Sequence, residues 1–322
     1  MPDVFLTGGS GWVGGALLRR LVADGRHVRA LARSVIASEI VRSRGAEPVR
    51  GDLLQPGDWE KRLAGCAILY HVAGEVAMCD RDRLEVNVAG TRNIVAAAGR
   101  AGVRRIVLTS SAATIGEAHG TVGAETTPPP RKWLSAYARS KHLAEQAAFA
   151  DAARLGIELV AVNPSSVQGP GRTHGSARIF IGFLRGKLRW AVETRMPLVF
   201  VDDAINGHLL AASRGKAGER YLISGWSPTV AEAVALLAEI SGVERRVRYL
   251  PGWMFSGAAG TVAAAWRLVG KEPPLCRAMA REVRHGHVFD SSKAERELGL
   301  KFTPPEEWLG ATVDWYREQG VF

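Results

Sequence analysis

"TGGSGWVGG", residues 7–15, is the stretch that decides the fold of this chain. It directly follows the apolar run "DVFL", which is typical of a buried strand, and it leads into a segment over residues 12–24 that is typical of a helix. Three of its glycines stand in a GxxGxxG spacing: Gly8, Gly11 and Gly14. Glycines at this spacing between a strand and a helix are typical of a turn that holds the pyrophosphate of a dinucleotide.

Each glycine has its own expected role in such a turn. Gly8 allows the tight turn, Gly11 lets the backbone approach a pyrophosphate without a Cβ in the way, and Gly14 lets the helix pack closely on the strand. The free N–H groups at the start of the helix would face the phosphates. The residues of this turn that are predicted to contact the cofactor are Thr7, Gly8, Gly11, Trp12, Val13 and Gly14.

Beyond the turn, apolar runs and helical segments alternate through the first half of the chain. Strands are expected at residues 27–33, 47–53, 67–74, 105–111 and 157–166. Helices are expected over 37–44, after a cap at Asp58, and over 82–100 and 134–154. Apolar β-branched runs between helices indicate a parallel sheet that is covered on both faces. The predicted fold class is therefore α/β, a doubly wound parallel-sheet Rossmann fold.

After Pro164 the pattern becomes irregular. Further strands are expected at 197–203 and 219–225, and Asp203 is placed to cap a helix that runs to about residue 213. The remaining expected helices are 229–240, 252–270, 274–282 and the tail from Pro305. This pattern predicts a dinucleotide-binding domain of residues 1–165 and 197–225. A smaller, mostly helical substrate-binding domain of residues 166–196 and 226–322 would close over the carboxyl edge of the sheet.

The overall composition is that of a soluble globular protein. The chain has 322 residues and a net charge of +10, but its basic residues are spread along the sequence, which favours a solvated surface over a nucleic-acid site. The uncharged stretch between Arg248 and Arg267 is rich in glycine and alanine, which predicts a buried or lid helix and no stable membrane insertion. The three cysteines, an odd number without metal-ligand spacing, indicate reduced thiols, a cytoplasmic location and no metal site.

Arg33 indicates which dinucleotide is used. An acidic ligand for the adenosine ribose is expected about 20 residues after the glycine motif, and Arg33 lies 19 residues after Gly14. A guanidinium there would bind a 2′-phosphate, with Ser34 as a second donor, which predicts NADP(H). NAD(H) remains the alternative if Arg33 is an ordinary surface charge. At the next strand end, Asp52 and Leu53 are expected beside the adenine, although Asp52 also suits a simple turn.

The segment "SAYARSKHLAEQ" carries the candidate reactive groups. Tyr137 and Lys141 stand at positions i and i+4 of one expected helix, so they share a face. A nearby ammonium is expected to lower the pKa of a tyrosine, which lets the phenol exchange protons near neutral pH. Ser110 and Ser111 end the preceding strand at the same edge of the sheet. Since successive strand residues point to opposite faces, only one of the two serines should face the pocket.

Together these motifs resemble those of the extended short-chain dehydrogenase/reductases over nearly the whole chain. "NVAGTRNIV", from Asn87, and "NPSSVQGPG", from Asn163, are similar to signatures of this superfamily. The chain looks most like its dihydroflavonol-reductase and 3β-hydroxysteroid-dehydrogenase branch. The pieces "HVAG", "NPSS", "GERYLISG" and "DSSKAERELGL" are also similar to the bacterial proteins named hopanoid-associated sugar epimerases.

The resemblance implies roles for individual residues. Ser111 is implied to be the catalytic serine, Tyr137 the general acid/base and Lys141 its partner, with Tyr137 and Lys141 also against the cofactor. Ile115 stands where many nucleotide-sugar epimerases have a tyrosine, which argues against a sugar substrate. The further residues implied to line the cofactor are Val72, Ala73, Gly74, Thr109, Pro164 and Val167.

The function predicted from these residues is NADP(H)-dependent reduction of a ketone or aldehyde to an alcohol, or the reverse reaction. The stretches "EVAMCD" and "GWMF" favour an apolar small-molecule substrate. A sugar-nucleotide epimerase or dehydratase that retains NAD is the alternative, with Arg172, Arg178 and Arg185 available to a diphosphate. A cofactor-sensing protein without catalysis is a third. The family also implies a homodimer formed through the helices near residues 83–100 and 134–154.

Overall fold

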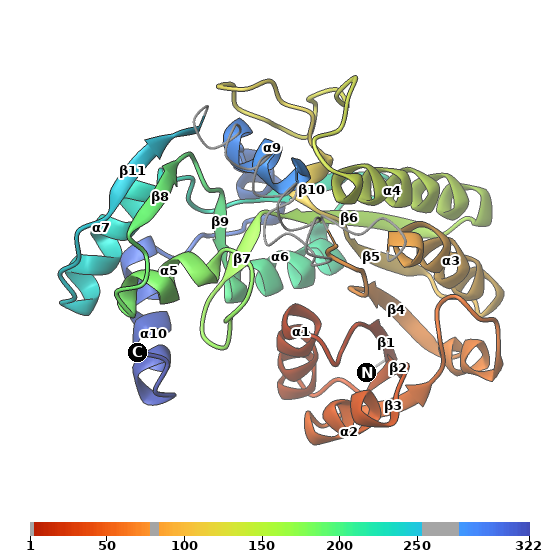
Figure 1. Ribbon diagram of the computed structural model, residues 1–322. Coiled ribbons are helices and arrows are strands. Elements are labelled where there is room, and N and C mark those ends of the chain that lie inside the picture. Colours follow the sequence, from red (N-terminus) through yellow and green to blue (C-terminus); the bar gives the residue numbers. More distant parts are fainter. Residues whose placement is uncertain (1–2, 78–83, 253–276) are drawn as a thin grey trace, which may run out of the picture.

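A seven-stranded parallel sheet forms the centre of the molecule, with the strand order β10-β6-β5-β4-β1-β2-β3 (Figure 1). The computed structural model describes residues 3–77, 84–252 and 277–322. The strands are β1 (Asp3–Thr7), β2 (Val28–Ala32), β3 (Glu47–Arg50), β4 (Cys66–His71), β5 (Arg105–Thr109), β6 (Glu158–Pro164) and β10 (Arg220–Ile223). The direction of winding reverses between β1 and β4, which is where doubly wound sheets bind their ligands. The predicted fold class is confirmed.

Alternate residues of each strand supply the two faces of the sheet. Val4 and Leu6 pack with α1 (Trp12–Ala23) and α6 (Val201–Arg214), whereas Phe5 packs on the opposite face. That face is covered by the 3-10 helix η1 (Asp58–Leu63), α3 (Thr91–Arg100) and α4 (Ala136–Leu155). Near the sheet edge lies α2 (Val35–Ser43), and the π-helical turn η3 (Val86–Gly90) leads into α3. Both faces are therefore buried, as in other parallel sheets.

A second apolar core lies beyond the sheet, where Figure 1 shows α5, α7 and α10 grouped together. Its helices are α5 (Ala177–Leu184), α7 (Val230–Ser241) and α10 (Pro305–Glu318). Two small parallel sheets adjoin it, in which β7 (Ser166–Gln168) pairs with β9 (Leu198–Phe200) and β8 (Trp190–Glu193) pairs with β11 (Arg248–Pro251). The sequence pattern did not predict β7, β8 or β11. The assignment of this region to a substrate-binding domain stays a prediction.

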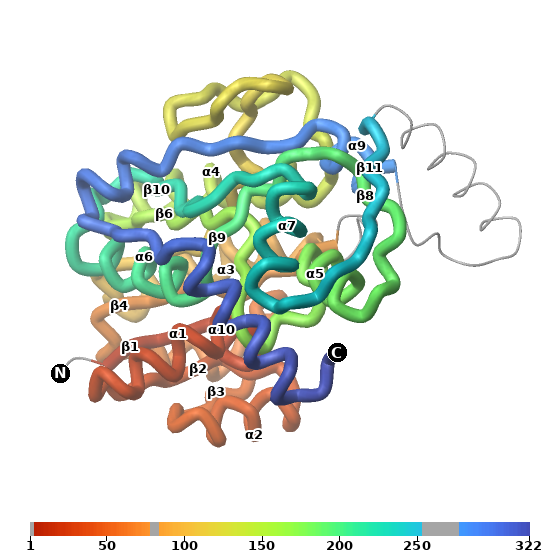
Figure 2. The backbone as a smooth tube through the Cα atoms, turned by 90° about the vertical axis from the view of Figure 1, so that its left-hand side faces the viewer, coloured from red at the N-terminus to blue at the C-terminus, as the bar shows by residue number. Residues whose placement is uncertain are grey.

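The segment near the C-terminus returns to the central sheet. After α9 (Arg277–His285), the chain runs along the loop that follows β5, where Gly123 N donates to Val288 O and Asp290 N donates to Gly123 O (Figure 2). The π-helical turn η5 (Ala294–Leu298) then packs into the same core as α1 and α6. Distant parts of the chain thus meet above the carboxyl ends of the strands.

Two expected helix caps are wrong. The helix α6 starts at Val201, so Asp203 lies in its first turn, where its buried carboxylate accepts from Thr303 N at 2.9 Å and Thr303 Oγ1 at 2.7 Å. Asp58 lies inside η1, whose N-cap is Gly57. In both cases a single aspartate in the sequence did not show at which residue the strand or loop ends and the helix begins. The helix expected at 252–270 falls almost entirely outside the described residues.

Among the described residues, none of the helices has the length and apolar character needed to cross a bilayer.

Candidate active site

The candidate site residues gather at one edge of the sheet because the strands are parallel. The glycine turn follows β1, Val72–Gly74 follow β4, and Ser110 and Ser111 follow β5. Pro164 is the last residue of β6, and Val167 lies in β7 just beyond it, partly buried. The four carboxyl ends belong to adjacent strands, so the sheet order alone brings these residues together.

The glycine turn forms a cradle that side chains would block. Gly8 has φ of +78°, and a Cβ built on it would lie 2.8 Å from Ala73 N; a Cβ on Gly14 would lie 2.2 Å from Gly8 O. Gly11 is the N-cap residue of α1 and makes no side-chain cap hydrogen bond. The first N–H groups of the helix are therefore not capped by a side chain. These features fit the pyrophosphate of a dinucleotide.

Buried polar contacts join this turn to the end of β4. Thr7 Oγ1 lies 2.7 Å from His71 Nδ1 and accepts from Ala73 N at 3.1 Å, while His71 Nε2 lies 2.9 Å from Thr91 Oγ1. Burial, with a smaller effect from Lys141, lowers the pKa of His71 to about 3, so the imidazole is neutral. The Thr7 hydroxyl therefore holds the strand ends in place, a role that the sequence did not indicate.

Arginines surround the turn at its ribose end. Arg33 directly follows β2; it is exposed and forms no ion pair with the described residues. Ser34 caps α2 by accepting from Ala37 N at 3.1 Å, which leaves its hydroxyl proton available to another acceptor. Arg44, which the sequence reasoning missed, donates to Gly9 O at 2.6 Å and Gly11 O at 3.0 Å.

The residues expected beside the adenine have structural contacts of their own. Asp52 Oδ1 accepts from Leu54 N at 2.9 Å, which is the turn that the sequence left open as an alternative. Leu53 is buried, and its carbonyl accepts from Asn93 Nδ2 at 2.7 Å. The second carboxylate oxygen of Asp52 has no hydrogen bond within the described part of the chain.

Ser111, and not Ser110, faces Tyr137. The Ser111 hydroxyl interacts with the Tyr137 phenol and lowers its pKa, and the Ser111 Oγ also accepts from Ala113 N at 3.2 Å. Ser110 is buried, and its Oγ has no hydrogen-bond partner among the described residues. Lys141 follows one turn later in α4, buried, and its Nζ donates to Thr109 O at 2.7 Å. The structure thus brings the predicted serine, tyrosine and lysine together.

The electrostatics of the tyrosine differ from the sequence expectation. Burial raises the pKa of Tyr137, the hydrogen bond from Ser111 lowers it, and the charge of Glu282 raises it further. The expected lowering by Lys141 is wrong for this structure, because burial dominates and the ammonium is directed to Thr109 O. Burial likewise lowers the pKa of Lys141 to about 8, against an opposing effect of Glu145.

Asn163 anchors the serine loop. Its Nδ2 donates to Glu145 Oε2 at 2.7 Å, to Thr114 Oγ1 at 3.0 Å and to Ser111 O at 3.2 Å. The same glutamate forms an ion pair with Arg220 at 3.2 Å. The sequence left the role of Asn163 open; the contacts make it a positioning residue for Ser111.

Two further side chains orient the groups around Lys141. Asn87 accepts from Glu75 N at 2.8 Å and donates to Ser140 Oγ at 3.1 Å, which ties the loop after β4 to α4. Thr109 Oγ1 lies 2.8 Å from His208 Nε2, and His208 Nδ1 donates to Ala204 O at 2.6 Å. Burial lowers the pKa of His208 to about 4, so this neutral ring accepts from the threonine.

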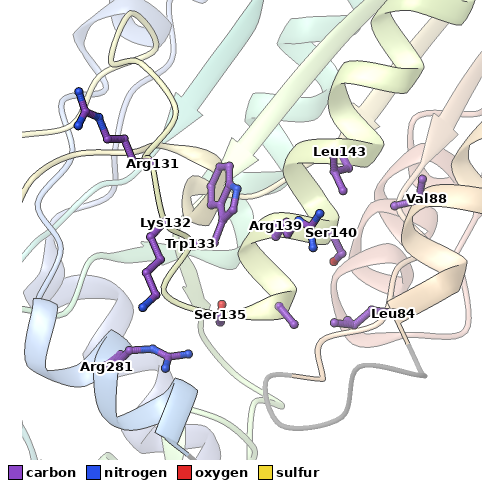
Figure 3. Close-up of a pocket in the computed structure, with 11 residues that line it drawn as sticks. Leu84, Val88, Arg131, Lys132, Trp133, Ser135, Arg139, Ser140, Leu143 and Arg281 are labelled. Atoms are coloured by element: carbon purple, nitrogen blue, oxygen red, sulfur yellow. The ribbon is translucent and has the colours of Figure 1, made fainter.

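A cavity of about 600 Å³ adjoins the start of α4. Figure 3 shows Lys132 and Arg281 at one side of it and Leu84 and Val88 at the other. Among the described residues its lining includes Ser135 and Ala136 but not the triad itself. The sequence predicted an apolar pocket, but this cavity combines apolar surface with four cationic side chains. These are Arg131, Lys132, Arg139 and Arg281. Residues 78–80 and Trp253–Phe255, which carried that prediction, lie outside the described residues.

The three arginines that the sequence offered as ligands for a substrate diphosphate do not gather at one place. The Arg172 guanidinium lies 5.2 Å from the centre of the Trp12 ring, and Trp12 Nε1 donates to Pro170 O at 3.3 Å. Arg178 is exposed, and Arg185 donates to the carbonyl of Val321 near the C-terminus. Only Arg172 therefore lies beside the glycine turn.

Comparison with known proteins agrees with the motifs. Residues 4–224 match the model of the NAD dependent epimerase/dehydratase family. A Synechocystis protein provisionally named dihydroflavonol 4-reductase is 34% identical over 98% of this chain and 95% of its own length. A 4-hydroxy-2-methyl-3-oxo-4-farnesyl-3,4-dihydroquinoline-1-oxide ketoreductase of Stigmatella aurantiaca is 32% identical over 92% of this chain and 90% of its own length.

Solved structures show the same fold. The crystal structure of gox2253 is similar with a TM-score of 0.87 and 30% identity, covering 100% of both chains. The UDP-glucose 4-epimerase of Thermotoga maritima, solved with UDP-glucose, has a TM-score of 0.79 at 21% identity, covering 98% of this chain and 99% of its own. The second likeness concerns the fold alone, because its identity is low.

Proposed function

This chain belongs to the NAD dependent epimerase/dehydratase family, and we propose that it is an NADP(H)-dependent reductase that converts a ketone or aldehyde to an alcohol, or catalyses the reverse. The observation that carries the proposal is that Ser111 interacts with Tyr137, with Lys141 one helical turn away at the carboxyl edge of the sheet. The glycine cradle beside it fits a dinucleotide. The ketoreductase name of a relative supports the same reaction class.

The residues of the triad would divide the work as follows. When bound, the cofactor supplies the hydride. Tyr137 would donate its phenolic proton to the carbonyl oxygen of the substrate, and Ser111 would hold that oxygen in place by a hydrogen bond. Burial raises the pKa of Tyr137, so the phenol holds the proton that it would give, and its transfer depends on stabilisation of the phenolate that forms. Lys141 would bind the cofactor ribose and stabilise the phenolate that forms.

A spectrophotometric screen tests this proposal. NADPH oxidation is followed over a panel of aryl ketones, sterol ketones, aldehydes, 3-oxoalkanoic acids and sugar nucleotides. The acids are included because four cationic side chains line the cavity beside α4, and because a Shewanella oneidensis relative is named a 2-alkyl-3-oxoalkanoate reductase. We expect turnover on a largely apolar carbonyl compound. Absence of turnover on the whole panel by a protein that still binds NADPH would favour the non-catalytic sensor.

A sugar-nucleotide epimerase or dehydratase is the second candidate, since the family name and the solved neighbours include that chemistry. Such an enzyme retains its NAD through oxidation and re-reduction of one substrate. Denaturing the purified protein and identifying the released nucleotide separates the two. Bound NAD⁺ would favour the epimerase, whereas an empty protein that needs added NADPH would favour the reductase. The cytoplasmic location and the homodimer stay predictions.

Changing Arg33 to alanine should weaken NADPH binding about tenfold and leave NADH binding nearly unchanged. A hydrogen bond to a charged group is worth about 1.5–3 kcal/mol, and solvent exposure of Arg33 places the effect near the lower limit. Fluorescence titration of both cofactors measures the ratio. Arg42→Ala, an exposed arginine on α2, is the matched control. Equal loss for NADPH and NADH would contradict a 2′-phosphate contact.

A further inference from the structure

A cluster of histidine and glutamate side chains lies where α9 meets the loop after β5, and the proposed reaction does not use it. His287 Nδ1 is hydrogen-bonded to Glu117 Oε1, and His287 Nε2 lies 3.0 Å from Glu282 Oε2. His285 Nε2 lies 3.6 Å from Glu117 Oε1. One ligand atom from each of three residues lies within 4.8 Å of the others: Glu117, His285 and His287.

Polar atoms in this cluster lack partners although they are buried. The Glu117 side chain is only 1% exposed, and its Oε2 accepts no hydrogen bond from the described residues. His285 Nε2 and Glu282 Oε1 are likewise buried without a hydrogen bond in the described part of the chain. Native proteins rarely leave several such atoms at one place. Three buried polar atoms of this cluster thus lack a hydrogen-bond partner among the described residues.

Both ring nitrogens of His287 lie against a carboxylate, Nδ1 against Glu117 and Nε2 against Glu282. Imidazole and carboxylate groups gathered at one place are ligand types that a divalent transition-metal ion takes. Glu282 already holds the other ring nitrogen of His287, which is how carboxylates usually orient a metal-bound histidine.

We propose that Glu117, His285 and His287 form a binding site for a divalent transition-metal ion, and that Glu282 positions His287. Two imidazoles and one carboxylate suit Zn²⁺, with a fourth position left for water. In a tetrahedral site with metal–ligand bonds of about 2.0–2.2 Å, ligand atoms lie about 3.3–3.6 Å apart. A pair of ligand atoms as far apart as 4.8 Å must therefore approach by about 1 Å, and Glu117 and His287 must separate to admit the ion.

Such an ion would fix the start of the catalytic helix. Ser135 interacts with Glu282 and lowers the pKa of that carboxyl, and its side chain caps α4 by accepting from Ala138 N at 3.1 Å. Tyr137 follows Ser135 by two residues. The cluster also joins α9 to the loop that Figure 2 shows beside it, so the ion would hold the C-terminal segment over the carboxyl edge of the sheet.

Metal titration of the full-length, untagged protein after chelator treatment and desalting tests the proposal. Co²⁺ binding is followed by its visible absorption and Zn²⁺ binding by calorimetry, and we expect one ion per chain. Glu282→Gln should weaken binding about 10- to 100-fold, as loss of an outer-sphere partner does, and His285→Gln should weaken it more. His174→Gln, an exposed histidine outside the cluster, should bind as the parent does.

The thermal midpoint provides a readout that does not depend on turnover. Zn²⁺ should raise the midpoint of the parent and of His174→Gln but not that of His285→Gln. If Glu117→Gln fails to fold by circular dichroism, His285→Gln and Glu282→Gln still decide the question. Failure of the parent to bind either ion, or equal binding by the parent and His285→Gln, would overturn the site.

Discussion

Tyr137→Phe should lower kcat for carbonyl reduction by about 10²- to 10⁴-fold and leave NADPH binding largely intact. That range is the usual contribution of a positioned general acid. The substitution removes only the phenolic oxygen, which interacts with Ser111. It leaves Lys141 bound to Thr109 O, so the groups expected around the cofactor keep their positions. Steady-state turnover on a substrate found in the screen, together with an NADPH titration, measures both effects.

Tyr70→Phe is the matched control for this experiment. Tyr70→Phe also removes a phenolic oxygen from a buried tyrosine, but Tyr70 lies on β4 and packs in the core with α1. We expect Tyr70→Phe to retain the parental kcat. Turnover by Tyr137→Phe within a few-fold of the parent would refute the assignment of Tyr137 as the proton donor, provided that the variant is folded and binds NADPH.

The fold and the outline of the site could be predicted because their signals are local. The β1 turn, the ends of β4 and β5, and the spacing of Tyr137 and Lys141 each occupy a short stretch, and a parallel sheet brings such stretches to one edge. The strand pattern alone narrowed the serine only to Ser110 or Ser111, and the resemblance to the family indicated Ser111. Which of the two faces Tyr137 depends on how α4 packs against the end of β5, and that information is not local.

Residues that act through distant partners could not be found in the same way. Arg44 reaches Gly11 across 33 residues, Asn163 reaches Ser111 across 52, and Thr7 reaches His71 across 64. No periodicity or motif within one stretch reports such contacts. A polar residue inside an apolar run, as in "LYHVAG" and "AVNPSS", was the one available signal, because a buried polar group must find a hydrogen-bond partner.

The prediction that Lys141 lowers the pKa of Tyr137 was wrong for a related reason. A lysine four residues along a helix is close in sequence, and proximity suggests that its charge acts on the phenol. The structure instead buries both groups, and burial opposes the charged form of each, so the pKa of Tyr137 rises and that of Lys141 falls. How deeply a residue is buried is a property of the assembled fold.

Lys141→Met should change how the stability of the cofactor-free protein depends on pH. Burial lowers the pKa of Lys141 from 10.5 to about 8, so the folded protein binds this proton less tightly than the unfolded chain does. The protonated lysine therefore destabilises the fold below about pH 8, by about 3 kcal/mol. This destabilisation disappears as the pH rises from about 8 to above 10.5, where the lysine is neutral in both states. Methionine has no such dependence.

The measurement is the free energy of unfolding of parent and variant at several pH values between about 7 and 10. Over that range the free energy of unfolding of the parent should rise by about 2–3 kcal/mol relative to that of Lys141→Met. Losing the hydrogen bond to Thr109 O adds a cost that does not depend on pH. The change of the difference with pH therefore reports only the proton of Lys141. Lys301→Met, at an exposed lysine, should run parallel to the parent. A parallel profile for Lys141→Met as well would mean that the folded site accommodates the ammonium without cost, and that folding does not lower the pKa of Lys141.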